Sequence, residues 1–354
     1  MRVAFITSRY TPESSPGAKR AAALTDALTA AGHDVTVLTQ MPNYPDPAAY
    51  EYARKGSTEV TREESGTRIW RFVPRVASKE DLVRRLAYEA RFAYLASSVR
   101  KQLSNLDGVV ASMPFVLNAA AARSFRLPMW LDVRDLTWEY IRAGRTPLRH
   151  LGARAFRSIA FSAFRAAQGI STTTESQRRY LIENGIPESR VHLVPNGVPE
   201  RLLEDLAGRT AAASSNGADG RVRAVYAGLL GYLQGIGFAV DAVSDGESCP
   251  AEIHLYGDGV ERPVLAERCR QRGLSNVTVY GHVPYPGYLD AIASADILFA
   301  TLRPEAESAM PSKLLEYMAA CTPILFAGAG EGAEVIRNAG AGLVTPYGDA
   351  KRFR

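Results

Sequence analysis

Cysteine is scarce in this chain, with three residues among 354. Cys249, Cys269 and Cys321 lie far apart and in no spacing typical of metal ligands, so we expect neither disulfides nor a zinc site. Because disulfides belong to oxidising compartments, their expected absence favours a cytoplasmic location. We likewise predict no bound metal and no cofactor.

Long hydrophobic runs are missing too. No stretch approaches the roughly 20 apolar residues of a membrane span, and the N-terminus lacks a signal-peptide pattern. Instead, residues 3–8 (VAFITS) predict a buried strand. The formal net charge of +5 is mild and is compatible with nucleic acid, an anionic membrane or a phosphorylated substrate. We predict no nucleic-acid partner, because the basic residues lie on amphipathic helices rather than in a reading motif.

Both common phosphate fingerprints are absent. No glycine-lysine-serine or glycine-lysine-threonine forms a P-loop, and no G-x-G-x-x-G with a following acidic strand end supports a dehydrogenase. Three expected strand-to-helix turns nevertheless carry glycine, namely Gly17, the group Gly228, Gly231, Gly235 and Gly237, and the pair Gly257 and Gly259. Such glycines let amides at a helix N-terminus approach a phosphate, although tight turns need them as well. The pattern favours a nucleotide diphosphate held largely by backbone.

Short apolar strands alternate with helical segments along nearly the whole chain. The expected strands are 3–8, 35–39, 109–111, 129–132 and 191–194 in the first half, and 222–227, 253–256, 277–280, 297–300 and 323–326 in the second. This alternation predicts an α/β fold of two Rossmann-like, doubly wound domains. We expect an N-terminal domain over 1–200, a small and polar linker over 201–220, and a C-terminal domain over 221–354. Ligands bind beyond the carboxyl ends of such strands, which predicts an active site in a cleft between facing domains.

The stretch 308–328, SAMPSKLLEYMAACTPILFAG, places one carboxylate, Glu316, on a short helix before a buried strand. Pro311 and Ser312 are expected to open this helix, because proline suits the first turn and serine can satisfy free amides.

Together these motifs resemble the family 4 glycosyltransferases, and especially the bacterial branch of N-acetylfucosaminyl and related transferases of polysaccharide assembly. The resemblance rests on MPNYP, VRD, VPNGV, YAGLLGYLQG, NVTVYGHV, ADILFATL and PSKLLEYMAA, spread over almost the whole chain. It implies a GT-B fold and a metal-independent, retaining hexosyl transfer from a nucleotide-sugar, with a UDP-sugar favoured. The implied acceptor is a lipid-linked or polysaccharide precursor, used by a cytoplasmic enzyme on the inner face of a membrane.

The resemblance also implies roles for individual residues. Glu316 matches the second glutamate of an E-x7-E motif and would bind the ribose hydroxyls, while Val283 would meet the base through its backbone. A solvated helix carboxylate is the alternative for Glu316. The other implied donor-binding residues are Gly17, Gly228, Gly231, Ser308, Ala309, Met310, Ser312 and Lys313.

Two departures from the family pattern affect this donor site. Ser308 stands where the first motif glutamate belongs, so backbone amides near Ala309 and Met310, or a neighbouring acid, would replace it. The usual arginine and lysine at the diphosphate fall near Leu229 and Gln234. Lys313 is therefore expected to supply the missing positive charge.

Arg134 and Asp135 are the predicted catalytic residues, with Arg134 holding a phosphate and Asp135 orienting an acceptor hydroxyl. A structural ion pair is the alternative. In the implied retaining reaction the departing diphosphate takes the acceptor's proton, so the protein chiefly positions groups and stabilises charge.

Other function classes stay open. A nucleotide-sugar epimerase shares this fold, and a non-catalytic subunit of a transferase pair would also tolerate the missing glutamate. Residues 81–103 and 145–165 each mix leucine and phenylalanine with several arginines. They predict either ordinary packed helices or a rim that lies against an anionic membrane.

Overall fold

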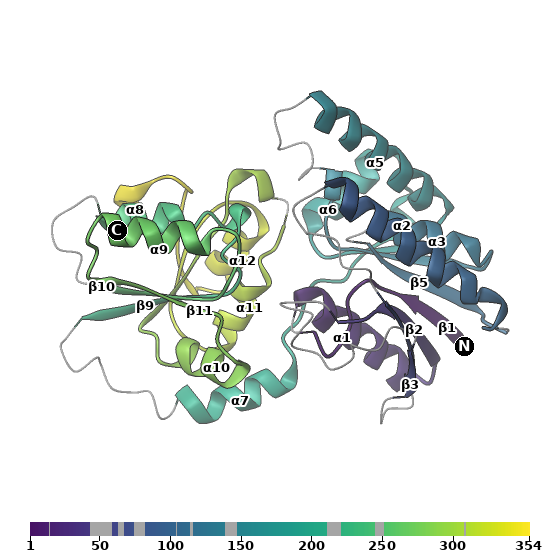
Figure 1. The fold of residues 1–354 in the computed structure, drawn as a ribbon, viewed down its shortest axis with the longest axis horizontal. Helices are drawn as coiled ribbons and strands as arrows, with labels where there is room; N and C mark the ends of the chain where they lie inside the picture. The colour runs from purple at the N-terminus through teal and green to yellow at the C-terminus, as the bar shows by residue number, and fades with distance from the viewer. Residues whose placement is uncertain are drawn as a thin grey trace. The chain divides into compact units, whose positions relative to one another are not determined.

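The computed structural model describes residues 1–13, 15–42, 59–62, 67–73, 82–103, 105–113, 116–138, 147–210, 221–244, 251–307 and 309–354. It divides into two units, unit 1 (Met1–Asn196) and unit 2 (Gly197–Arg354). Each unit is built around one sheet (Figure 1).

Unit 1 contains an eight-stranded sheet in the order β3-β4-β2-β1-β5-β6-β7-β8, parallel except for the antiparallel pair β3 and β4. Its strands are β1 (Arg2–Ile6), β2 (Asp34–Gln40), β3 (Glu59–Arg62), β4 (Arg68–Phe72), β5 (Gly108–Met113), β6 (Met129–Val133), β7 (Gly169–Thr172) and β8 (Val191–Leu193). Its helices are α1 (Pro16–Ala30), α2 (Leu82–Ser98), α3 (Val116–Ser124), α5 (Pro147–Ala166) and α6 (Glu175–Glu183), with short turns η3 (Val99–Lys101) and η4 (Glu188–Arg190).

The apolar run of β1 is explained by burial on both faces. Ala4 and Ile6 belong to a core that contains α2, α3 and α5, whereas Phe5 packs in a second core with α1. Successive strand residues point to opposite faces, so a strand covered by helices on both sides has no polar position.

Unit 2 contains a fully parallel sheet in the order β11-β10-β9-β12-β13-β14. Its strands are β9 (Val222–Ala227), β10 (Ala251–Tyr256), β11 (Val277–Gly281), β12 (Ile297–Thr301), β13 (Ile324–Ala327) and β14 (Gly342–Thr345). Its helices are α7 (Glu200–Thr210), α8 (Gly237–Ser244), α9 (Arg262–Gln271), α10 (Tyr285–Ala293), α11 (Ser312–Ala319), α12 (Gly330–Asn338) and α13 (Ala350–Phe353), with turns η5 (Tyr232–Gln234) and η6 (Pro304–Ala306). Figure 1 shows α8 and α9 on one face of this sheet and α10 on the other.

The predicted α/β class with two doubly wound halves is confirmed. Each expected strand lies within two or three residues of an observed one, but the prediction missed β3, β4, β7 and β14. Among the described residues, no helix is both long enough and apolar enough to cross a membrane.

The linker expected over 201–220 is corrected in its first half. The contacts divide the chain after Asn196, and α7 occupies residues that we expected to be linker. This helix packs against α10 and α11 because Leu202 and Leu206, one turn apart, are both buried. The remaining linker positions, 211–220, lie outside the described residues.

Candidate functional site

In unit 2, helix α11 is fastened to the carboxyl end of β9. The buried hydroxyl of Tyr317 accepts a hydrogen bond from the Ala227 N–H at 2.8 Å and donates one to the Ala227 carbonyl at 3.1 Å. Burial raises the pKa of Tyr317, so the phenol stays protonated as this double contact requires. The helix therefore presents its polar residues at the strand end where parallel sheets bind ligands.

Lys313, one turn before Tyr317, places a cation beside the β9 turn. Its Nζ donates a hydrogen bond to the Tyr226 hydroxyl and lies 3.6 Å from the centre of the Tyr226 ring. Burial lowers the pKa of Lys313 from 10.5 to about 7, against the opposing effect of Glu316. Burial makes the charged form of Lys313 unfavourable. An incoming anion would stabilise that form, so the ammonium group is a suitable partner for one.

Gly228 makes room for that lysine. Its φ of +149° is rare for other residues, and a Cβ at this position would lie 2.8 Å from the Lys313 Nζ. Two predicted donor-binding residues that are 85 positions apart in the chain are thereby brought together. A side chain at position 228 would displace the ammonium group.

Glu316 accepts a hydrogen bond at Oε2 from the Tyr288 hydroxyl. Burial, together with the Glu316 carboxylate, raises the pKa of Tyr288 well above its usual value, so this tyrosine remains a donor. Tyr288 lies on α10, which begins two residues after Val283. Helix α10 thus joins the predicted ribose-binding and base-binding positions.

The glycines after β9 and β10 have separate uses. A Cβ at Gly257 would lie 1.8 Å from the Gly228 carbonyl oxygen, and one at Gly259 would lie 2.3 Å from the Leu230 carbonyl oxygen. These two glycines are needed for close packing of neighbouring turns, which is the tight-turn alternative to the phosphate interpretation. Gly231 has an ordinary φ of −112°, and the side chain of Gln234 is nearest to its missing Cβ.

The start of α11 differs from expectation. Pro311 is the N-cap rather than the first helical residue, and no side chain caps the helix, so the prediction of a serine cap at Ser312 is wrong. The Ala309 amide donates to the Ala306 carbonyl at 2.9 Å, which makes it unsuited to replace the motif glutamate, whereas Met310 is half-buried nearby. Ser308 lies outside the described residues.

Arg303 is a site residue that the sequence reasoning missed. It follows β12, and its guanidinium carbon lies 4.2 Å from the centre of the Tyr232 ring and 5.8 Å from that of Tyr347. Its Nε is buried without a hydrogen-bond partner, and its backbone N–H donates to the Leu233 carbonyl at 2.9 Å. A cation three residues after the expected strand 297–300, in the sequence TLRP, was the available signal.

In unit 1, Arg134 lies beside the N-terminus of α1. Ser15 caps this helix by accepting the Ala18 N–H, and a Cβ at Gly17 would lie 2.4 Å from Nη1 of Arg134. Burial lowers the pKa of the Arg134 guanidinium, opposed by Asp135 and Asp132, and its Nε is buried without a partner. The predicted pair Gly17 and Arg134 therefore shares one polar corner where two strands end.

An ion pair that the sequence did not single out fixes this corner. Arg20 of α1 contacts Asp132 of β6 at 2.7 Å, with both side chains buried, and also donates to the Val194 carbonyl at 2.9 Å. The Gln177 amide and the Thr173 hydroxyl hold the Arg134 carbonyl. Arg134 and the adjacent Asp135 thus stand on fixed backbone.

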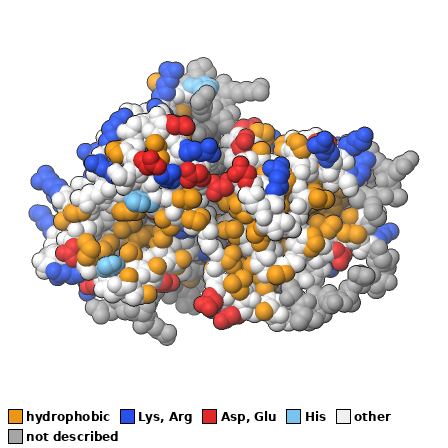
Figure 2. Space-filling model, turned by 180° about the vertical axis from the view of Figure 1, so that it is seen from behind, with side chains coloured by type: hydrophobic (Ala, Val, Ile, Leu, Met, Phe, Trp, Pro, Cys, Tyr) orange, Lys and Arg blue, Asp and Glu red, His pale blue; other side chains and the backbone are white. Residues whose placement is uncertain are grey.

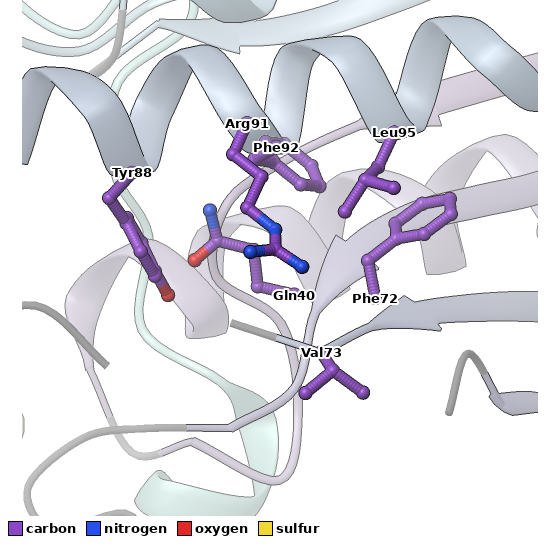
Figure 3. A pocket seen from close by; sticks show the side chains of 7 residues that line it. All are labelled: Gln40, Phe72, Val73, Tyr88, Arg91, Phe92 and Leu95. Carbon is purple, nitrogen blue, oxygen red and sulfur yellow. The ribbon is translucent and has the colours of Figure 1, made fainter. Parts of the chain in front are cut away.

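A small hollow lies at the carboxyl ends of β2 and β4 (Figure 3). Gln40 and Phe72 end the two strands, and Tyr88, Arg91, Phe92 and Leu95 of α2 cover them. Its volume of about 10 Å³ is close to the minimum for one water molecule. A sugar would need α2 to move, so this hollow is not a preformed acceptor site.

Metal ligands are not gathered in the described part of the chain, where no group of three or more His, Cys, Asp or Glu residues could hold an ion. The polar groups at the end of β9 in unit 2 and at the Gly17 and Arg134 corner of unit 1 are instead cations, hydroxyls and separate carboxylates. Such groups bind and orient an anionic, hydroxyl-rich ligand.

Comparisons with known proteins identify the family of the chain. A glycosyl transferase 4-like domain family matches residues 17–197, just over half of the chain, and the glycosyl transferases group 1 family matches residues 221–354. One relative is a protein of Escherichia coli (strain K12) named as the colanic acid biosynthesis glycosyl transferase WcaI. It is 24% identical to this chain over 337 residues, and the match covers 90% of this chain and 81% of that protein.

Solved structures show the same fold. Sucrose-phosphate synthase from Thermosynechococcus elongatus matches 99% of this chain and 87% of its own, with a TM-score of 0.73 and 16% identity. Anabaena HepE, in its complex with UDP-glucose, gives a TM-score of 0.65 and 17% identity, with 99% of this chain and 87% of its own covered. The fold is GT-B, and the chain belongs to the glycosyltransferases that join a glycosyl transferase 4-like domain to a group 1 domain.

Proposed function

We propose that this glycosyltransferase moves a sugar from a nucleotide-diphosphate sugar, with a UDP-sugar favoured, to a lipid-linked or polysaccharide precursor. The observation that carries the proposal is the arrangement at the end of β9, where Gly228, Lys313 and Glu316 stand together. A cation beside a glycine turn suits a diphosphate, and a carboxylate one turn away suits a vicinal diol.

In this proposal Glu316 accepts hydrogen bonds from both ribose hydroxyls while Tyr288 holds its other oxygen. Lys313 and Arg303 supply the positive charge that the family pattern places near Leu229 and Gln234. Arg303 suits the role because two tyrosine rings fix its plane, and arginine binds phosphate oxygens in a forked geometry. Val283 would receive the base through its backbone.

We propose further that Arg134 and the amides near Gly17 hold a phosphate, and that Asp135 orients an acceptor hydroxyl. The reaction then proceeds with retention, without a metal, and with the leaving diphosphate as the proton acceptor. The Arg134 Nε is buried without a hydrogen-bond partner, and the pKa of this guanidinium is lowered. Both observations support a site that would bind an anion. The one relative named for colanic acid biosynthesis favours an acceptor from polysaccharide assembly.

A nucleotide panel tests the donor. Isothermal titration of the full chain should give binding of UDP. UMP should bind more weakly because it lacks the second phosphate, and GDP and ADP should bind more weakly because the proposal favours uracil at the base position near Val283. Tight binding of UMP equal to that of UDP would remove the diphosphate role. An epimerase would interconvert UDP-sugars without acceptor, and a non-catalytic subunit would bind UDP without turnover.

We also propose that α2 of unit 1 rests on an anionic membrane surface, at the inner face of the membrane. Tyr94 is 72% exposed on this helix and Arg91 is exposed beside it. The side chains of Arg84 and Arg85, which we expect to join this face, lie outside those described. Liposome flotation should require anionic lipid and decline when Arg84, Arg85 and Arg91 become glutamate; flotation that is equal on neutral lipid would contradict it.

A further inference from the structure

A hollow in unit 1, which we name the α5–α6 hollow, is distinct from the polar corner at Gly17 and Arg134. It is lined by Arg154, Arg157, Ser158, Phe161 and Arg165 of α5 and by Asn184 at the end of α6, and its volume is about 210 Å³. One water needs only about 10–15 Å³ by the same measure, so the hollow has room for a phosphate or a pyrophosphate. None of the proposed donor or catalytic residues lines it.

The charge of the hollow has one sign. Three of its lining residues are arginines and none is acidic. The whole of α5 contains four arginines and no aspartate or glutamate. Like charges gathered around one concavity raise the local positive potential, which concentrates anions there. In Figure 2, Lys and Arg side chains stand along the upper left edge of the view, the side on which α5 lies.

Arg157 is held in place within the hollow. Its Nε donates to the Tyr180 hydroxyl at 3.0 Å and its Nη2 donates to the Asn184 Oδ1 at 2.7 Å. Its guanidinium carbon also lies 4.7 Å from the centre of the Phe161 ring. Two neutral acceptors and an aromatic face orient this cation without neutralising it, and Nη1 is left for another acceptor.

Arg165 also lines the hollow, beside the same aromatic ring as Arg157. Its guanidinium carbon lies 5.8 Å from the centre of the same Phe161 ring, so one buried ring orders two arginines. Arginine is the side chain best suited to phosphate, because its planar fork of donors matches the phosphate oxygens. Ser158 adds a neutral hydroxyl donor at the same concavity.

We propose that the α5–α6 hollow is a binding site for a phosphoryl group, taken either from a free phosphate ester or from the headgroup of an anionic lipid. The occupant supplies the negative charge that the lining lacks. Arg157 holds one oxygen from its fixed position, and Arg154 and Arg165 close on the others. The proposal is independent of the donor site in unit 2.

The test uses the full chain and inorganic pyrophosphate at low salt, with isothermal titration as the measurement. Arg154 does not take part in the contacts that orient Arg157 and Arg165. Arg154→Gln should therefore weaken pyrophosphate binding at the α5–α6 hollow by about tenfold, as expected for one charge-assisted hydrogen bond. Arg154→Gln, Arg157→Gln and Arg165→Gln combined should remove that binding. Arg179→Gln, an exposed arginine on α6 outside the lining, makes the same charge change as Arg154→Gln and should leave binding unaltered. Lys313→Met should also leave binding at the hollow intact, which separates it from the donor site.

Vesicles distinguish the two sources of the phosphoryl group. Flotation is compared on phosphatidylcholine alone and on phosphatidylcholine with phosphatidic acid. Pyrophosphate binding that needs the three arginines assigns a soluble ligand, and flotation on phosphatidic acid that needs them assigns a lipid headgroup. If the triple variant, shown to be folded by circular dichroism, matches the wild type in both measurements, the proposal is overturned.

Discussion

Lys313 gives the proposed donor site a pH dependence that can be worked out from its surroundings. A pKa lowered from 10.5 to about 7 means that the ammonium form costs about 5 kcal/mol in the folded protein relative to the unfolded chain, at about 1.4 kcal/mol for each factor of ten. Between pH 7 and pH 10.5 the unfolded chain binds a proton at this residue that the folded protein lacks. The free energy of unfolding therefore gains a contribution that rises with pH across this window, and below pH 7 the cost is constant.

Donor binding should show the opposite trend. At pH 7 about half of the Lys313 side chains are charged, and at pH 9 about 1% are, so a ligand that requires the ammonium form binds about 50-fold more weakly at pH 9. The bound diphosphate should also draw a proton from solution, because an adjacent anion raises the pKa of a lysine.

The assay is isothermal titration of UDP at pH 7, 8 and 9, in buffers of different ionisation enthalpy that report proton uptake. Lys313→Met should bind UDP weakly at every pH, with no proton uptake and no pH-dependent gain in stability from this residue. Lys351→Met, at an exposed lysine of the same unit, is the control and should match the wild type. A wild-type UDP affinity that stays flat from pH 7 to pH 9, or an unchanged pH profile in Lys313→Met, would refute the reasoning.

Other substitutions in unit 2 should change the affinity for UDP, measured by isothermal titration, to different extents. Glu316→Ala should lower UDP affinity ten- to a hundredfold, the scale of about 1.5–3 kcal/mol for charged hydrogen bonds, and unchanged affinity would remove the ribose role. Tyr288→Phe should cost about fivefold, because only one neutral donor to Glu316 is lost, and no effect would mean that Glu316 is oriented otherwise. Gly228→Ala should abolish UDP binding by displacing Lys313. Gly231→Ala should retain it, since its φ is ordinary and only side chains lie near its missing Cβ; an equal loss of UDP affinity in the two variants would contradict the assigned geometry. Arg303→Gln should weaken UDP but not uridine, and an equal loss for both would place this arginine away from the diphosphate.

The strands of the fold could be predicted well because parallel strands buried on both faces are continuous apolar runs. Residues 222–227, for example, match β9 without error. The strand β7 was missed because its sequence, GIST, is short and carries two hydroxyl residues, although all four are buried. The pairing of β3 with β4 escaped prediction because it depends on a partner strand rather than on a local pattern.

The site could be predicted only in part. Motif resemblance supplied Lys313, Glu316 and Gly228, but not the contact between Lys313 and Gly228, which depends on how α11 packs on β9. The role of Gly257 could not be read from sequence either, because a close approach of two backbones is a tertiary property. Arg303 was missed since its partners, Tyr232 and Tyr347, are far away in the sequence.

Transfer itself is the most direct test of the central claim. The purified chain is incubated with radiolabelled UDP-sugars and an acceptor fraction of bacterial lipid-linked oligosaccharides, and UDP release is measured together with labelled product. We predict that one UDP-sugar gives equal amounts of UDP and of labelled product with the anomeric configuration of the donor, and that Glu316→Ala loses most of both. Recovery of an isomerised UDP-sugar, or of intact donor with every acceptor despite tight UDP binding, would contradict a sugar transferase.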